Sequence, residues 1–171
     1  GMQTKENIQN FRGFGGAQSY PSRTKDIDDV DISTGSVGLG VAMTSFISLI
    51  QDYILKKQFG KNIPQGRMIA LVGDAELDEG NVYECLQEGW KHDLRNVWWI
   101  IDYNRQSLDG VVHEGLSERL SSVFEAFGWN LIILKYGKLQ NEAFEELGGH
   151  LLKKWIDDCP NQLYSALIYE G

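Results

Sequence analysis

Oxygen-bearing side chains follow two apolar stretches of this sequence, at the point where each stretch ends. Asn104 follows the second stretch, 96–102, and lies 30 residues after Asp74, which follows the first. That separation is about the length of one strand–helix–strand unit, and successive parallel strands end at the same edge of a sheet. We therefore expect Asp74 and Asn104 to meet in space. Four carboxylates come directly after the first stretch, 67–72: Asp74, Glu76, Asp78 and Glu79.

A carboxylate and an amide oxygen form a pair of hard, oxygen-only ligands. Such ligands suit Mg²⁺ or Ca²⁺ better than zinc. Two protein groups are too few to enclose the ion, and magnesium commonly completes its octahedron with water and phosphate oxygens. The pattern therefore indicates a phosphorylated ligand. The alternative is that the acidic residues only cap a helix N-terminus, where negative charge is favourable.

A glycine-rich stretch, "STGSVGLG" (33–40), offers a place for phosphate. Its glycines, Gly35, Gly38 and Gly40, precede a helical pattern, and bare backbone at a helix N-terminus suits an anion. The spacing is neither the Rossmann fingerprint nor a P-loop. These glycines alone do not identify a site, so the prediction depends on the pairing of Asp74 with Asn104.

Apolar periodicity predicts the elements that position these residues. Strands of continuous apolar residues alternating with helices are typical of a parallel sheet covered on both faces. We predict an α/β fold, a three-layer α/β/α arrangement with a mainly parallel sheet. Helices are expected from Gly38–Gly40 to before Gly60, at 79–93, at about 115–127, and at 141–158 with a weak point at Gly148–Gly149. Strands are expected at 67–72, 96–102 and 129–136, while 163–170 is either a fourth strand or a buried tail.

The composition is that of one ordinary globular domain. The chain has 171 residues, 42% of them hydrophobic and 23% charged. A net charge of −8 argues against a nucleic-acid partner and against binding to an anionic membrane surface. No apolar run reaches the length of a membrane span. We expect residues 1–30 to form an irregular N-terminal segment and 31–171 to form the binding domain. Gly1 looks like the remnant of a cleaved expression tag.

The number and spacing of the cysteines indicate the redox state of the protein's cellular compartment. Cys85 and Cys159 are too few and too far apart for a disulfide framework. They indicate reduced thiols in a cytoplasmic protein.

Several ordered motifs resemble one family. "GDAELDEGN" followed by "NRQSLDGVV" resembles the thiamine-diphosphate motif, and "STGSVGLG" resembles a glycine stretch of transketolases. Together with "NFRGFGGAQSYPS" and "VFEAFGWNLIILKYG", the wording most resembles the homodimeric 2-oxoacid (pyruvate) dehydrogenase E1 component. The resemblance spans about residues 8–170. It implies the thiamine-diphosphate-binding fold, with thiamine diphosphate and Mg²⁺ as cofactors.

The resemblance also implies roles for particular residues. Asp74 and Asn104 would ligate Mg²⁺ through side-chain oxygens, and Gln106 through its backbone carbonyl. Asp109–Gly110 would form the turn that closes the loop. His113, after that loop, is the one histidine with a claim on substrate. The diphosphate would be lined by two segments, namely Gly73, Ala75 and Glu76, and Gly35, Ser36, Val37 and Gly38.

Departures from the family pattern affect these expectations. Ala75 replaces the second glycine of the motif and is tolerable only with a negative φ. Asp102 replaces an Asn found in many members. Ser22 stands where E1 relatives carry an active-site His, which bears on substrate handling more than on cofactor binding.

The resemblance covers only the diphosphate-binding domain of such enzymes. We therefore expect a fragment or split subunit that is inactive alone and needs a pyrimidine-binding domain or subunit. The expected assembly is a homodimer, with a lipoyl-bearing acyltransferase as a further partner. The expected reaction is decarboxylation of a 2-oxoacid and acyl transfer to lipoamide. The alternatives are transketolase-type transfer of two-carbon units between sugar phosphates, and a degenerate, non-catalytic oligomerisation module.

Overall fold

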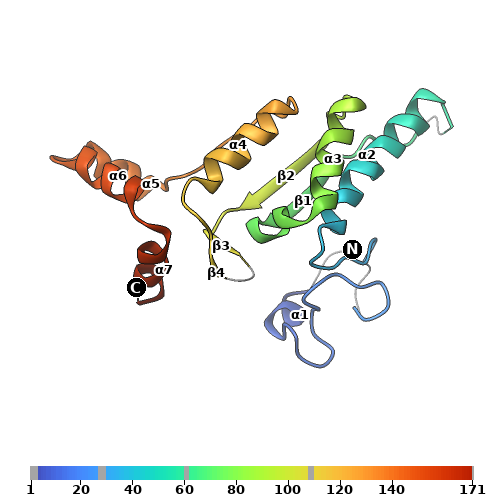
Figure 1. Cartoon of the computed structure of the whole chain (residues 1–171). Coiled ribbons are helices and arrows are strands. Elements are labelled where there is room, and N and C mark those ends of the chain that lie inside the picture. Colours follow the sequence, from blue (N-terminus) through green and yellow to red (C-terminus); the bar gives the residue numbers. More distant parts are fainter. Residues whose placement is uncertain (1–3, 27–29, 60–61, 108–109, 171) are drawn as a thin grey trace. The chain divides into compact units, whose positions relative to one another are not determined.

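The computed structural model describes residues 4–26, 30–59, 62–107 and 110–170 (Figure 1). They belong to two compact units, Gly1–Asp102 and Tyr103–Gly171. Within the described ranges, no helix combines the length and the apolar character that crossing a membrane requires.

The first unit alternates helices with strands, as the sequence predicts. The structure confirms four predicted elements to within two or three residues. They are the long helix after Gly38, the two strands predicted at 67–72 and 96–102, and the helix between those strands. The N-terminal segment is mostly irregular but contains one short helix. The elements in chain order are α1 (Lys5–Gln9), α2 (Leu39–Lys56), β1 (Met68–Gly73), the 3₁₀ helix η1 (Asp74–Asp78), α3 (Gly80–Lys91) and β2 (Val97–Asp102).

Strands β1 and β2 pair in parallel, which confirms the predicted direction of the sheet. The register runs from Met68 opposite Val97 to Gly73 opposite Asp102. Both strands therefore end at the same edge. This common edge is where the sequence predicts the ligand site.

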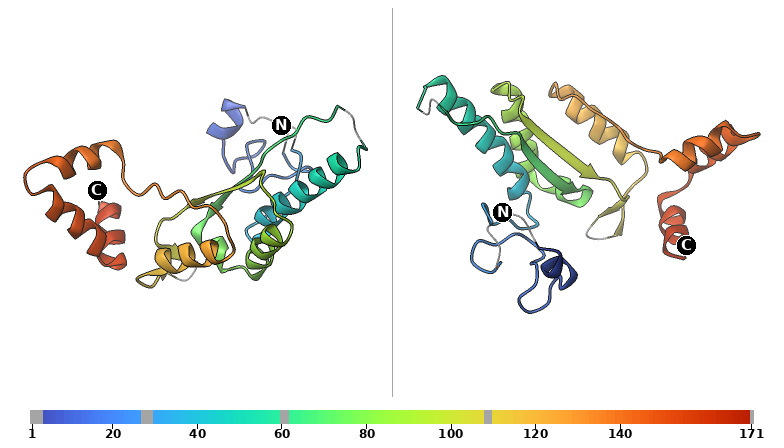
Figure 2. Two further views of the ribbon diagram at one scale, coloured as in Figure 1. Left: turned by 90° about the horizontal axis from the view of Figure 1, so that it is seen from above. Right: turned by 180° about the vertical axis from the view of Figure 1, so that it is seen from behind.

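Helix α2 packs on one face of this sheet, and α3 packs against α2 (Figure 2). Ala70 and Val72 of β1 are buried on the covered face. The indole N–H of Trp99 donates to the Thr44 hydroxyl of α2 at 3.1 Å. The Ser48 hydroxyl of α2 donates to the Asn96 side chain, just before β2. These contacts fix the middle of α2 against β2 and the residue that precedes it.

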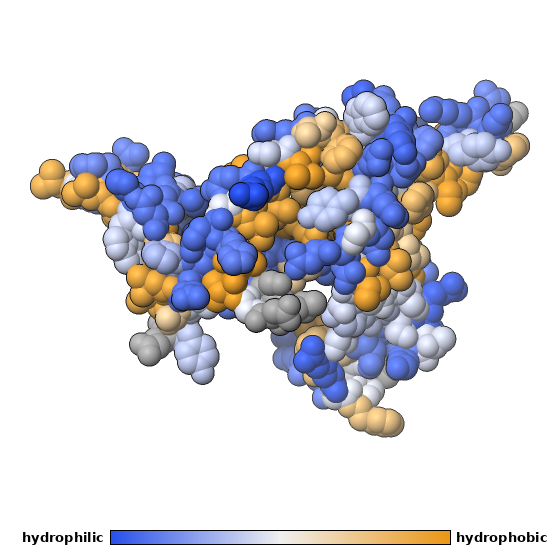
Figure 3. Space-filling view, in the orientation of Figure 1, coloured by the Kyte–Doolittle hydropathy of each residue, from blue (hydrophilic) through white to orange (hydrophobic). Residues whose placement is uncertain are grey.

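The other face of the β1–β2 sheet exposes apolar side chains. Leu71 is 78% exposed and Ile69 53%. Trp98 is half exposed, with the Arg67 guanidinium 4.0 Å from its ring centroid. In the described part of the first unit, helices thus cover one face of the sheet, whereas the sequence predicts cover on both. Apolar surface is also visible elsewhere, over helices as well as near the sheet (Figure 3).

The second unit is mainly helical. Its elements are β3 (Gln106–Ser107), β4 (Gly110–Val111), α4 (Leu116–Ala126), α5 (Lys138–Glu145), α6 (Gly149–Asp158) and α7 (Asn161–Glu170). The short strands β3 and β4 form an antiparallel pair. The prediction of α4 is confirmed. The single helix predicted at 141–158 is interrupted at Gly148, whose φ of 84° is left-handed, so that α5 and α6 are separate.

The strand predicted at 129–136 is wrong, and 163–170 is neither the strand nor the buried tail that the sequence left open. Residues 129–136 form no strand, and Ile132 and Leu134 in this segment are 87% and 91% exposed. A strand requires a neighbour for its backbone N–H and C=O groups, and this segment has no strand beside it in the described part of its unit. Residues 163–170 lie in helix α7, where the Tyr164 N–H donates to the Pro160 carbonyl at 2.8 Å. A proline at the start of a helix loses no intrahelical hydrogen bond.

Candidate functional site

The shared edge of β1 and β2 carries the first predicted ligand, Asp74. Gly73 ends β1 in extended conformation, and the chain then turns into the 3₁₀ helix η1. Asp74 is only 5% exposed, and its carboxylate accepts the N–H of Ala75 at 3.1 Å. A buried carboxylate at the end of a parallel strand is placed as a cation ligand would need to be.

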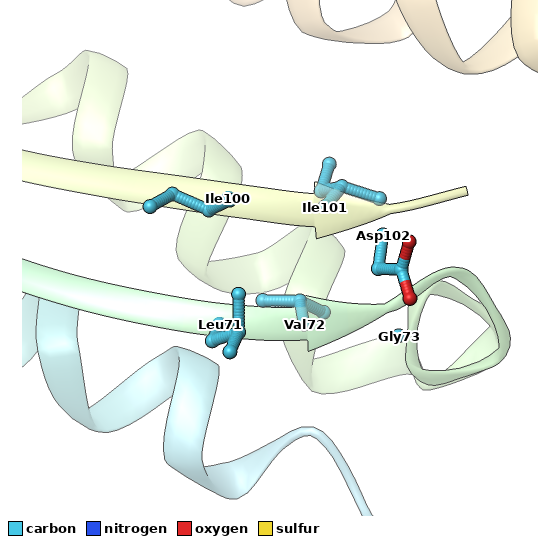
Figure 4. Close-up of a pocket in the computed structure, with 6 residues that line it drawn as sticks. All are labelled: Leu71, Val72, Gly73, Ile100, Ile101 and Asp102. Carbon is cyan, nitrogen blue, oxygen red and sulfur yellow. The ribbon is translucent and has the colours of Figure 1, made fainter.

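A hollow of about 420 Å³ opens at the ends of the two strands. In Figure 4 the carboxylate of Asp102 lies between the strand ends, on the side of Gly73. The hollow is thus apolar along the strands and acidic at its end. Its lining comprises Leu71, Val72, Gly73, Ile100, Ile101 and Asp102.

Ala75, the departure from the motif's second glycine, adopts a conformation that an alanine tolerates. It lies inside η1 and is not among the described residues with positive φ. The Cβ of an alanine is unstrained in a helical conformation. The substitution therefore does not disqualify the segment from the role that the motif implies.

The two predicted cofactor-lining segments of the first unit come together at the start of α2. Gly38 is the N-cap of α2, buried and left-handed with a φ of 72°. Its N–H lies near enough to the Glu76 carboxylate to lower the pKa of that group. The Asn81 side-chain amide of α3 donates to the carbonyl of Val37 at 2.7 Å. The glycine loop is thus tied both to η1 and to α3.

Burial raises the pKa of the Glu76 carboxyl above its ordinary value. The nearby backbone N–H of Gly38 lowers this pKa and the nearby Glu79 raises it, so the net shift is upward. The N-terminus of α2 makes no hydrogen bond to its own N-cap side chain, because glycine has none. The free N–H groups and the dipole of this helix end favour an anion.

The remaining lining residues of the glycine loop are accessible. Ser36 is exposed and Val37 is 46% exposed. A Cβ built on Gly35 or on Gly73 would meet no heavy atom within 4 Å. Space for a ligand therefore exists beside both segments.

The loop that carries Asn104 and Gln106 belongs to the second unit. The Asn104 side-chain oxygen accepts the Gln106 N–H at 2.9 Å, which closes a tight turn. Between them, Arg105 has a left-handed φ of 64°. Its guanidinium donates to the Cys159 carbonyl and to the Asn161 side chain, each at 3.3 Å, and lies 4.1 Å from the ring centroid of Tyr164. Helix α7 thus holds this loop.

We expect Arg105→Ala to loosen the loop of Asn104. The change removes two hydrogen bonds and a cation–π contact, which together stabilise the loop by about 1–3 kcal/mol. Hydrogen exchange of residues 104–107 should accelerate accordingly. Arg95→Ala is the control, because the Arg95–Asp93 ion pair is about three-quarters exposed and should contribute little. Equal protection of 104–107 in both variants would contradict the assignment.

The predicted metal ligands are distributed over both units. Asp74 belongs to the first unit, and Asn104 and Gln106 belong to the second. Their convergence on one ion stays a prediction. Asp109, part of the predicted turn, lies outside the described residues. His113 is exposed after β4, and its predicted role in handling substrate is untested.

The donor groups fit a magnesium diphosphate better than a bare metal ion. Among the described residues, no three His, Cys, Asp or Glu side chains are grouped closely enough to hold a metal. A divalent ion at Asp74 would therefore need amide, carbonyl or phosphate oxygens as further ligands. The glycine loop beside Glu76 supplies the backbone N–H groups that phosphate requires. The residues present are compatible with both components.

Sequence reasoning missed two residues that shape this site, Asn81 and Arg105. Asn81 contacts a carbonyl 44 positions earlier, and Arg105 contacts groups 54 and 56 positions later. Both lie inside the quoted motifs, GDAELDEGN and NRQSLDGVV, but the motifs assign no role to either side chain. Such contacts carry no signal in the spacing of a single sequence.

Taken together, the parallel strands, the acidic strand end and the glycine loop define a domain of the class that binds a phosphorylated cofactor at a sheet edge. Residues 2–146 match the family described as transketolase, thiamine diphosphate binding domain. The chain belongs to this family.

Curated relatives agree with that assignment. The chain is 30% identical to a transketolase of Staphylococcus aureus over 134 residues, which covers 77% of this chain and 20% of the relative. It is 30% identical to a transketolase of Staphylococcus epidermidis, again over 77% of this chain and 20% of the relative. It is 29% identical to one of Halalkalibacterium halodurans, over 82% and 22% respectively. The chain thus spans about a fifth of the length of these relatives, whose names favour the transketolase alternative over E1.

Proposed function

We propose that this domain anchors the diphosphate of thiamine diphosphate, through Mg²⁺, in an enzyme that transfers two-carbon units between sugar phosphates. The observation that carries the proposal is the junction of the two predicted lining segments. Asn81 holds the Val37 carbonyl, the Gly38 N–H lowers the pKa of the nearby Glu76, and Asp74 is buried at the end of β1. Family membership supports the cofactor, and the names of the relatives support the reaction class.

Each group of residues has a proposed role in holding the cofactor. Asp74 would bind Mg²⁺ through its carboxylate, together with the Asn104 side-chain oxygen and the Gln106 carbonyl. Backbone N–H groups of the glycine loop and of η1 would bind the phosphate oxygens. Thiamine diphosphate, when bound, supplies the carbanion-stabilising chemistry, and this domain supplies anchoring and orientation.

Calorimetric titration of the chain with thiamine diphosphate, with and without Mg²⁺, tests the anchoring role. Binding that requires Mg²⁺ and is abolished by a chelator is the expected result. If the chain binds no cofactor alone, the titration is repeated with the complete protein. Failure there as well would refute the proposal and favour the non-catalytic module.

The reaction class is tested on the complete protein. Turnover of a ketose phosphate with an aldose phosphate acceptor would support the transketolase assignment. Decarboxylation of pyruvate with acyl transfer to lipoamide would support the E1 alternative instead. The sequence motifs are compatible with both reactions, because both require the same anchoring of the cofactor's diphosphate.

We also propose that the chain self-associates, as a dimer. Helix α2 carries an exposed apolar stripe at helical spacing: Leu39, Phe46, Ile50 and Tyr53, each between 46% and 55% exposed. Light scattering should give a mass well above the 19.3 kDa of one chain. Ile50→Asp should lower that mass, whereas Gln87→Asp on the exposed surface of α3 should not. A monodisperse wild-type monomer at high concentration would contradict this proposal.

A further inference from the structure

The side chain of Asn81 holds one end of a peptide group in the glycine loop. Asn81 lies in the first turn of α3, and its amide nitrogen donates to the Val37 carbonyl at 2.7 Å. Its amide oxygen is shielded from solvent and has no hydrogen-bond partner among the described residues. The reverse amide orientation would set two acceptor oxygens against each other, so the contact requires nitrogen as the donor.

The other end of the same peptide group meets an anion. Since the peptide bond is planar and trans, the Val37 carbonyl and the Gly38 N–H point in opposite directions. The Gly38 N–H lies on the side of the Glu76 carboxylate, whose pKa it lowers. Asn81 therefore holds one end of this peptide by a hydrogen bond, and the other end faces a negatively charged group. By fixing the carbonyl, Asn81 aims the N–H away from α3 and toward the position of a negative charge.

We infer that Asn81 is a positioning residue of the diphosphate cradle, which orients the Gly38 N–H toward the phosphate oxygens. This inference rests on the proposed function. Without the Asn81 donor, the 37–38 peptide is free to rotate. A rotated peptide would present its carbonyl oxygen to the diphosphate in place of an N–H. The cradle would then lose a donor and gain a repulsive acceptor at the N-terminus of α2.

Asn81→Leu tests the inference, because leucine has a similar volume but no donor. Gln87→Leu is the matched control, since it makes the same kind of change at an exposed position of α3. The probe is inorganic pyrophosphate with Mg²⁺, which needs only the diphosphate half of the site. We expect Asn81→Leu to weaken its binding about tenfold, as the loss of one well-placed hydrogen bond would. Gln87→Leu should bind as the wild type does.

The backbone amide resonance of Gly38 gives a readout independent of binding. In the ligand-free chain it should move toward the position of a free amide in Asn81→Leu and stay unchanged in Gln87→Leu. A variant that is merely less stable would lower the unfolding midpoint without moving this resonance in the folded state. Asn81→Ala replaces the leucine variant if the latter does not fold.

The outcomes separate this inference from the proposed function. If the wild type binds magnesium pyrophosphate and Asn81→Leu binds it equally well, the inference is wrong and the proposed function stands. If the wild-type domain, alone and in the complete protein, binds no magnesium pyrophosphate, the proposed function fails and the cradle role of Asn81 fails with it. An unmoved Gly38 resonance in a folded Asn81 variant would overturn the positioning role in every case.

Discussion

Replacing Asp74 by asparagine should nearly abolish Mg²⁺-dependent binding of thiamine diphosphate, with a loss in affinity on the order of 100-fold. Asp74 is 5% exposed at the end of β1, so its charge is poorly screened by water. A divalent ion at this position depends on that charge, and an amide of the same shape does not supply it. The asparagine oxygen can still accept the Ala75 N–H, so the free energy of unfolding should change by less than about 1 kcal/mol.

Asp78→Asn is the matched control for this change. Asp78 lies at the end of the same 3₁₀ helix and is exposed. Neutralising it removes the same charge a few residues away, outside the predicted ligand set. Titration calorimetry should therefore show a large difference between the two variants in the presence of Mg²⁺. Without Mg²⁺ the difference should disappear. If both variants lose affinity equally, the effect is one of net charge and Asp74 is not a metal ligand.

The parallel pair β1–β2 could be predicted because the information is local. Each strand is a continuous apolar run of fewer than ten residues, and a helical pattern lies between them. Runs this short, separated by one helical pattern, are typical of neighbouring strands in a parallel sheet. The register then follows from the common edge, where Gly73 and Asp102 lie opposite each other. The position of Asp74 beside that edge follows in turn.

The segments 129–136 and 163–170 could not be predicted in the same way. Both are rich in apolar and aromatic residues, a composition that suits a strand or a buried helix equally. The choice depends on whether another strand lies alongside, which local pattern does not encode. In 129–136 the side chains of Ile132, Ile133 and Leu134 stay exposed. In 163–170, the proline just before α7 favours a helix start instead.

At the candidate site, motif reasoning located the segments but not the contacts that shape them. The motifs predict that Gly38 and Glu76 line one ligand, and the effect of the Gly38 N–H on the pKa of Glu76 places their segments side by side. Asn81 and Arg105 act through contacts more than 40 positions apart. The helical conformation of Ala75 also depends on the fold around it. That conformation removes one argument for the degenerate, non-catalytic module.

Gly38→Ala should be the most disruptive glycine-to-alanine substitution in the glycine loop, 33–40. The φ of 72° at this position disfavours any residue with a Cβ by about 1–2 kcal/mol. An alanine Cβ would also lie 2.4 Å from the Asn81 amide oxygen and 2.8 Å from a methyl carbon of Val82. Relieving those overlaps would displace the start of α3 or rotate the glycine loop. Together the two effects should lower the free energy of unfolding by about 2–4 kcal/mol.

Gly35→Ala in the same loop separates this effect from a general need for glycine. A Cβ at Gly35 meets no heavy atom within 4 Å, and its φ is not left-handed. Alanine there should leave stability unchanged or raise it by about 0.4–1 kcal/mol, because it restricts the unfolded chain. Urea unfolding of both variants measures the difference. If both variants are destabilised equally, the loop requires glycine for its flexibility. If only Gly38→Ala is destabilised, the loop requires a left-handed residue at this one position, which is packed against Asn81.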